Sequence, residues 1–359
     1  MDDVAAERDA FVQRVHDAAL GFFDVLSMRL GDRLGLYTAL AERQDLSSAE
    51  LAERAGIAER YAREWLEQQT AAGILRASGL DTGTQRFSLP PGHAEVLLDR
   101  DSLSYMAPTI RSLMTVTPVM DALVEAYRTG GGVRWDAYGS DARESVGDSN
   151  RPVYLQVMSR RWLPAIPAIH DRLSAAPAAR VADVGCGTGW SSIAIALAYP
   201  DVSVHGFDRD DSSIDLARRN AEAEGVADRV TFEARDAVAP GDAGAYDLVT
   251  FFECLHDMAF PVDALRAAHR MLVGGGMVLV GDERTNDVFL GAQDDVDRYH
   301  YGWSILACLP AAMVDPGAAG TGTVMRPATL RSYAAEAGLS GFEVLPIEDE
   351  SFRLYLLRP

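Results

Sequence analysis

The spacing of apolar residues divides the chain into a helical first part and a second part of alternating strands and helices. Over residues 1–30 the apolar side chains recur at helical spacing, which predicts one long amphipathic helix. A face this broad must be buried, and a long N-terminal helix of this kind often buries it against a partner subunit. The apolar positions are Phe11, Val15, Ala18, Ala19, Phe22, Phe23, Leu26 and Leu30.

Residues 33–90 predict three helices followed by a short hairpin. Ser47 and Glu50 have the spacing of a capping box at a helix start, and Gly56 follows that helix. A third helix is expected from about residue 57 to 72, and short strands at 74–76 and 85–89. This order of elements resembles a winged helix.

The third of these helices leaves two roles open for the winged helix. A winged helix can bind DNA through its third helix, but this one carries three acids and two bases, Glu59, Arg60, Arg63, Glu64 and Glu67. The whole chain has a net charge of −20, and phosphate binding needs clustered cations. Dimerisation or covering of the substrate is therefore favoured over DNA binding.

The second half of the chain predicts a parallel α/β sheet. Residues 95–175 have a mostly helical pattern broken by Gly130–Gly132, and from Val181 short apolar strands alternate with amphipathic helices. We divide the chain into residues 1–100, a helical linker and substrate lid at 101–174, and an α/β domain at 175–359. The expected strands are 181–184, 202–206, 230–234, 247–252, 277–281, 342–347 and 352–357.

A glycine-rich turn after the first of these strands is the strongest motif. Asp183 precedes Gly185, Gly187 and Gly189, and glycines at such a turn let a ligand approach bare backbone. Dinucleotide-binding domains prefer the spacing G-x-G-x-x-G, whereas this turn is G-x-G-x-G and contains no basic residue. It therefore suits a zwitterionic sulfonium ligand better than a dinucleotide.

Three further segments fit the same ligand. Asp208 ends the second strand, next to Arg209, and its carboxylate is positioned to accept both hydroxyls of a ribose. Asp236 follows the third strand and can accept an adenine amino group, while Ala237 leaves room for the ring. Phe252 ends the fourth strand, whose carboxyl end points into the same crevice.

With these four segments in order, residues 175–359 resemble the class I S-adenosylmethionine-dependent methyltransferases. Residues 11–359 together resemble the winged-helix small-molecule methyltransferases, which include plant-type O-methyltransferases and bacterial natural-product relatives. The resemblance implies a Rossmann-like sheet of seven strands ending in an antiparallel hairpin. It also implies S-adenosyl-L-methionine as cofactor, S-adenosyl-L-homocysteine as product, and a homodimer whose N-terminal domain covers a small-molecule substrate.

His256 is the candidate general base. It lies just past the fourth strand, where Leu255-His256-Asp257 resembles the segment that carries the catalytic histidine of the O-methyltransferases. A hydroxyl acceptor must lose its proton, and histidine is the usual base near neutral pH. In that family an acid after the fifth strand orients the base, and Asp282 or Glu283 matches this position.

A second interpretation of the same residue involves a metal. A related branch of 2-oxo-acid C-methyltransferases holds a metal with histidines in this region, so His256, Asp257 and His300 are possible ligands. The alternative activity is then metal-assisted C-methylation of a substrate like a 2-oxo acid, while N-methylation also stays open.

The substrate pocket is expected under an insertion at residues 284–326 that includes His300 and Trp303. Together with Tyr154 and His256, these residues are the candidate substrate contacts. If such aromatic residues line a pocket, the acceptor is apolar or aromatic.

Composition limits the remaining functions. All 33 basic residues are arginine, which excludes mechanisms that need a catalytic lysine. Three cysteines without a CxxC pair suggest neither a disulfide framework nor a zinc finger. The acidic start of the chain lacks a signal-peptide pattern and no apolar run reaches ~18 residues, so we expect a cytoplasmic protein without a membrane segment.

Two further functions remain alternatives. The chain could be a ligand-sensing winged-helix regulator, or it could use the methyltransferase fold for other chemistry.

Overall fold

The computed structural model describes residues 2–239, 243–291 and 295–359. These residues form two compact units, Met1–Met114 and Thr115–Pro359. The predicted domain boundaries at residues 100 and 174 stay predictions.

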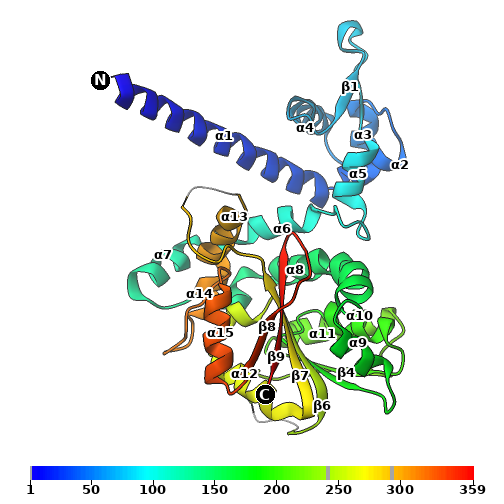
Figure 1. Cartoon of the computed structure of the whole chain (residues 1–359). Helices are drawn as coiled ribbons and strands as arrows, with labels where there is room; N and C mark the ends of the chain where they lie inside the picture. Colours follow the sequence, from blue (N-terminus) through cyan, green and yellow to red (C-terminus); the bar gives the residue numbers. More distant parts are fainter. Residues whose placement is uncertain (1, 240–242, 292–294) are drawn as a thin grey trace. The chain divides into compact units, whose positions relative to one another are not determined.

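The first unit is helical with one small hairpin, in the order that the sequence predicts (Figure 1). Its core consists of apolar side chains such as Leu40, Leu51, Leu66 and Phe87, which come from the three central helices and the hairpin. The elements are α1 (Asp2–Arg33), α2 (Leu36–Glu42), α3 (Ser48–Ala55), α4 (Glu59–Ala71), β1 (Arg76–Ser78), η1 (Leu80–Thr82), β2 (Arg86–Ser88), α5 (Pro91–Leu98) and α6 (Ala107–Thr115).

Local signals explain two features of this unit. The capping box at Ser47 and Glu50 is present, and Gly56 ends α3 in the left-handed conformation. The first strand was predicted at 74–76 but begins at Arg76. The backbone N–H groups of Ile74 and Leu75 donate to the Gln69 carbonyl near the end of α4, which keeps these two residues out of the strand.

Helix α1 confirms one long helix at the start of the chain but leaves its apolar side chains exposed. Phe11, Phe22 and Phe23 are 64%, 53% and 61% exposed in the single chain. Isolated apolar residues on a surface are ordinary, but a row of phenylalanines along one helix is a sign of an interaction surface.

The second unit begins with a helical segment. Gly130 ends α7 with a φ of 74°, as the predicted break at the three glycines requires. The elements are η2 (Thr117–Val119), α7 (Met120–Thr129), η3 (Trp135–Tyr138), α8 (Ser140–Pro152), the π-helical η4 (Val153–Trp162) and α9 (Pro167–Ser174).

A sheet of seven strands follows, in the order β5-β4-β3-β6-β7-β9-β8. The pairs from β5 to β7 are parallel, whereas β9 pairs antiparallel with both β7 and β8. All seven predicted strands are present and the antiparallel end of the sheet is confirmed. The strands are β3 (Arg180–Val184), β4 (Ser203–Asp208), β5 (Val230–Ala234), β6 (Tyr246–Phe252), β7 (Leu272–Glu283), β8 (Gly341–Val344) and β9 (Phe352–Arg358).

Helices cover both faces of this sheet (Figure 1). Helices α9, α10 (Trp190–Ala198) and α11 (Asp211–Ala223) pack on one face, and α12 (Pro261–Met271) and α15 (Pro327–Glu336) pack on the other. The predicted insertion contains α13 (Asp295–Trp303), the π-helical η6 (Ser304–Cys308) and α14 (Leu309–Ala312), and its residues 292–294 lie outside the described residues.

One strand of this unit begins earlier than the sequence predicts. Strand β7 starts at Leu272 rather than at residue 277, because Tyr246 of β6 already pairs with Leu272. Helix α11 is capped by Asp210, whose carboxylate accepts a hydrogen bond from the Ser213 backbone N–H at 3.0 Å. Within the described part of the chain, no helix combines the length and the apolar character that crossing a bilayer requires.

Candidate active site

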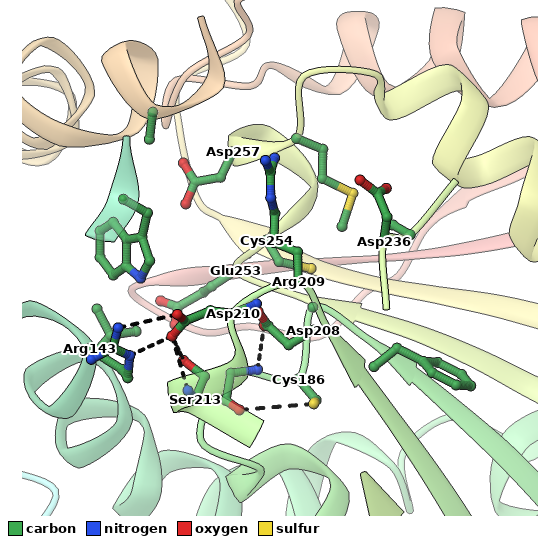
Figure 2. A pocket seen from close by; sticks show the side chains of 18 of the residues that line it. Arg143, Cys186, Asp208, Arg209, Asp210, Ser213, Asp236, Glu253, Cys254 and Asp257 are labelled. Atoms are coloured by element: carbon green, nitrogen blue, oxygen red, sulfur yellow. Dashed lines mark hydrogen bonds and ion pairs between the residues drawn. The ribbon is translucent and has the colours of Figure 1, made fainter. Parts of the chain in front are cut away.

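A cavity of about 510 Å³ opens at the carboxyl ends of the parallel strands. This edge of an open α/β sheet is where ligands bind, because the turns after neighbouring strands converge there. The wall includes nine residues that the sequence singled out, namely Tyr154, Gly185, Gly187, Asp208, Arg209, Asp236, Ala237, Phe252 and Asp257. The described residues thus bring the four predicted segments together in one place (Figure 2).

The glycine turn after β3 needs its glycines for two different reasons. All three glycines have positive φ, 71° at Gly185, 52° at Gly187 and 86° at Gly189. A Cβ at Gly185 would lie 2.7 Å from the Cys254 side chain, and one at Gly189 would lie 2.7 Å from the Phe232 ring. Gly187 has open space beside it, so its backbone is left bare toward the cavity.

Asp183 holds this turn from behind rather than facing the cavity. Its side chain is 1% exposed and accepts hydrogen bonds from the hydroxyls of Ser191 (2.5 Å), Ser192 (2.6 Å) and Thr250 (2.7 Å). Burial raises the pKa of Asp183, and these hydroxyls act in the opposite direction. Neither Asp183 nor Gly189 belongs to the cavity wall, so their predicted contact with a cofactor stays a prediction.

Asp208 ties the end of β4 to the glycine turn. One carboxylate oxygen accepts from the Gly187 backbone N–H and the other from the Asp210 N–H, both at 2.9 Å. Burial raises the pKa of Asp208 although both N–H groups lower it. Each oxygen keeps a lone pair for a second donor, as a ribose diol would require. Arg209 also lines the cavity, and its guanidinium lies 3.6 Å from the Asp315 carboxylate.

The opposite end of the cavity is formed by the turn after β5. Asp236 accepts a hydrogen bond from the Val238 backbone N–H at 3.0 Å, which fixes its carboxylate beside Ala237. Phe252, at the end of β6, contacts the Tyr154 ring with 5.7 Å between the ring centres. Tyr154 and Phe252 thus form an aromatic part of the cavity wall at the end of β6.

The cavity wall also contains residues that sequence reasoning missed, including Arg143, Asn150, Asp210 and Glu253. Arg143 donates to both carboxylate oxygens of Asp210 (Figure 2), so two parts of the chain 67 residues apart are joined at this wall. No motif marks these positions. Glu253 alone could have been identified from the sequence, because it directly follows Phe252 at the end of β6, where ligands bind in such sheets.

Glu253 is held in an unusual backbone conformation. Its φ is 48°, in the left-handed region that residues other than glycine rarely adopt. The Asn150 amide and, at 3.4 Å, the Tyr154 hydroxyl donate to one carboxylate oxygen, Oε2. Removal from solvent raises the pKa of Glu253 to about 7, although these donors and the charge of His256 lower it.

His256 is buried between two carboxylates, just behind the cavity. Its Nδ1 lies 2.6 Å from Asp282 and its Nε2 lies 3.3 Å from Asp257. Burial lowers the pKa of His256, but the charges of Asp257 and Asp282 outweigh it and hold the pKa well above the usual 6.5. The structure therefore brings His256 together with Asp282, as the sequence predicted, and Asp257 separates the ring from the cavity.

The remaining candidate residues lie away from the cavity wall. Glu283 is not among its lining residues, and neither are His300 and Trp303 of α13, so their functional roles stay predictions. For a metal, the described residues gather atoms of His256, Asp257 and Cys308 within 4.8 Å of one another, with Cys308 in the position expected for His300. Burial raises the pKa of the Cys308 thiol to about 12.

Two family models match the chain. Residues 176–321 match a model described as a methyltransferase domain, and residues 23–99 match one described as an Rv2258c-like winged HTH domain. The chain thus joins a winged helix-turn-helix domain to a methyltransferase domain with a Rossmann-like sheet, which confirms the predicted fold class.

The chain is also similar to parts of curated methyltransferases. It is 34% identical to the 27-O-demethylrifamycin SV methyltransferase of Amycolatopsis mediterranei over 120 residues, which are 33% of this chain and 44% of that protein. It is 28% identical to a ubiquinone biosynthesis O-methyltransferase of Pseudomonas aeruginosa over 167 residues, or 46% and 66% of the two chains. The match therefore spans 44% to 66% of the length of these relatives.

Solved structures resemble nearly the whole chain. The mitomycin 7-O-methyltransferase shares 19% identity with a TM-score of 0.71 and covers 99% of both chains. Human N-acetylserotonin methyltransferase, solved in complex with SAM, shares 17% identity with a TM-score of 0.70 and covers 97% of both chains. At these identities the likeness shows a common fold.

The first prediction concerns the hydroxyls around Asp183. Asp183→Asn keeps the shape of the side chain but replaces one of its two acceptor oxygens with an NH₂ group. The three hydroxyls, which now bond to two oxygens, would then have one oxygen as acceptor. We expect a loss of about 1–3 kcal/mol in the free energy of unfolding, measured with urea. Asp201→Asn, at an exposed aspartate, is the control. Equal stability of both variants would show that the hydroxyl bonds do not hold the turn.

Proposed function

We propose that this chain, which joins a winged-helix domain to a methyltransferase domain, transfers a methyl group from S-adenosyl-L-methionine to a small molecule. One observation carries the proposal: the bare turn at Gly187, the carboxylate of Asp208 and the Asp236–Ala237 wall all line one cavity. These groups match a nucleoside in the order of amino-acid tail, ribose and adenine. The cofactor would supply a methyl group already activated by its positively charged sulfur.

The charges of the cavity wall support this cofactor over a dinucleotide. Four arginines line the cavity, and each lies within 4 Å of an acid, in the pairs Arg134–Asp136, Arg143–Asp210, Arg209–Asp315 and Arg235–Glu233. The acids Asp208, Asp236 and Glu253 lie on the same wall. A pyrophosphate would meet a surface whose cations are already paired, whereas a cationic nucleoside would be attracted.

The acceptor that fits this wall is apolar or aromatic. Trp135, Tyr154, Phe252 and Met258 line the cavity, and its volume lies within the range of small-molecule sites. The chain's task is then to exclude water and to hold the acceptor in line with the sulfur, which supplies much of the rate increase.

We propose O-methylation with His256 as the base. Asp282 accepts a hydrogen bond from Nδ1–H and so leaves Nε2 on the cavity side, where Asp257 now lies 3.3 Å from it. A hydroxyl of the acceptor would take the place of the Asp257 carboxylate at Nε2 and give its proton to this nitrogen. Because the two acids raise the pKa of His256, the ring must first release its own proton.

The winged helix is proposed to serve self-association rather than DNA binding. In α4, Arg60 pairs with Glu64 and Arg63 with Glu59, so the helix offers phosphates little unpaired positive charge. The exposed phenylalanines of α1 instead supply an apolar face for a second copy. A homodimer formed in this way would bury the row that one chain leaves exposed.

The cofactor is tested by binding. Isothermal titration calorimetry should detect S-adenosylhomocysteine and S-adenosylmethionine but no NADH. Asp208→Ala should lower the affinity for S-adenosylhomocysteine and for S-adenosylmethionine by about tenfold or more, because it removes the charged acceptor of the ribose hydroxyls. Asp215→Ala, at a residue outside the cavity wall, is the control. Binding of NADH in place of both nucleosides would contradict the proposal.

The base is tested with an acceptor found by screening and by measuring S-adenosylhomocysteine formation. We expect His256→Ala to lose at least about a hundredfold in turnover while cofactor affinity is kept. In the unaltered chain, turnover should rise with pH with a midpoint above 6.5, because the proton leaves a histidine whose pKa is raised. His269→Ala serves as the control, and full turnover of His256→Ala would remove this residue from the reaction.

Self-association is tested by light scattering of the whole chain. We expect a mass near twice 38.8 kDa. The double substitution Phe11→Glu and Phe22→Glu should give the single-chain mass, because burying two carboxylates in an apolar interface is costly. Gln13→Glu on the same helix should leave the dimer intact. A monomer before substitution would refute this interface.

A further inference from the structure

The acid of the glycine motif is not available to a ligand in the cavity. Both oxygens of Asp183 accept hydroxyl hydrogen bonds, from Thr250 at Oδ1 and from Ser191 and Ser192 at Oδ2. The side chain is 1% exposed and stands behind the cavity wall. A positively charged group that enters the cavity near Gly185 must therefore be received by another carboxylate.

Glu253 has the geometry for that role. It lines the cavity together with Gly185, and its positive φ turns it out of the line of β6. The two donors, Asn150 and Tyr154, both bind Oε2. Among the described residues none forms a hydrogen bond or an ion pair with Oε1. One oxygen is thus fixed from α8 and η4, and the other is free for a ligand.

The surroundings of Glu253 favour a cation as that ligand. The arginines of the cavity wall lie beside other acids, and Glu253 has no arginine among the described residues. The titratable groups that act on it are Tyr154, His256, Asp282 and Glu283, three acids and one base. Removal from solvent raises the pKa of Glu253 to about 7, and a bound cation would favour its ionised form.

The position of Glu253 relative to the other acids indicates which cation. In Figure 2, Asp208 lies between Glu253 and Asp236. If Asp236 receives the adenine and Asp208 the ribose, the amino-acid tail extends toward Gly185 and Glu253. Resting on the proposed function, we propose that Glu253 Oε1 binds the α-ammonium group of the cofactor's amino-acid tail, with Asn150 and Tyr154 positioning the carboxylate.

The test compares two ligands that differ only in this tail. S-adenosylhomocysteine carries the ammonium group, whereas 5′-methylthioadenosine has the same adenosine and sulfur without it. By calorimetry, Glu253→Gln should bind S-adenosylhomocysteine about tenfold more weakly or worse, because a charge-assisted hydrogen bond is lost. Its affinity for methylthioadenosine should stay within about twofold, which also reports that the variant is folded.

Two further variants complete the comparison. Asp236→Asn, at the predicted adenine end, should weaken both ligands alike. Asn150→Ala should also weaken the binding of S-adenosylhomocysteine selectively, but by a smaller factor than Glu253→Gln. The carboxylate that binds the ammonium group is still present in this variant and loses only the Asn150 hydrogen bond that positions it. This second variant provides the same readout if Glu253→Gln does not fold.

The outcomes separate this inference from the proposed function. Failure of the unaltered chain to bind either nucleoside would refute the methyltransferase proposal itself. If the unaltered chain binds both nucleosides, and Glu253→Gln binds S-adenosylhomocysteine as tightly as the unaltered chain does, only the role of Glu253 is refuted. The role of Glu253 would also be refuted if both variants, Glu253→Gln and Asn150→Ala, lost as much affinity for methylthioadenosine as for S-adenosylhomocysteine. The effect would then not depend on the amino-acid tail.

Discussion

One buried carboxylate holds together the three elements on which the site is built. Asp183 lies next to the last residue of β3, Ser191 and Ser192 belong to the first turn of α10, and Thr250 lies in β6. Their hydrogen bonds fix the glycine turn between strand and helix, so that its backbone stays open to the cavity. A buried charge is tolerated only when its lone pairs are satisfied, and here hydroxyl donors satisfy it. The consequence is that the acids facing the cavity must come from other segments.

Those other segments surround His256 with acids. His256 lies between Asp257 and Asp282, and Glu253 stands near them. The two π-helical segments contribute to this cluster, η4 through Tyr154 and η6 through Cys308. Such wider helical turns are rare and often occur at functional sites, since they direct side chains that a regular helix would turn away. A cluster of acids with this charge attracts cations.

Much of the fold could be predicted because each element has a local signal. Buried parallel strands are short apolar runs, and glycines or capping residues mark their ends. The capping box at Ser47 and the turn at Gly185–Gly189 are examples. The segments of the cavity wall could be predicted for the same reason, because each directly follows a strand. Asp208 and Asp236 are therefore found on the cavity wall, where the sequence puts them.

The contacts between distant segments could not be predicted. Nothing near Cys308 in the sequence indicates that its thiol lies beside His256, 52 positions earlier, and the same holds for Asn150 and Glu253. The hydrogen bond from Thr250 to Asp183 could not be predicted either, because Thr250 comes 67 residues later. Local spacing reports the direction of a side chain within one element. It does not report which side chains of other elements meet it.

The order of strands at the antiparallel edge has a consequence for how the chain is assembled during synthesis. Strand β9 lies between β7 and β8, although β8 leaves the ribosome first. Until Phe352–Arg358 is made, β8 has no strand to pair with and the exposed side of β7 has no neighbour. The half of the sheet from β3 to β6 can form earlier from local βαβ units. Translation that stops before β9 would thus release a chain with a formed glycine turn and an open, association-prone sheet edge.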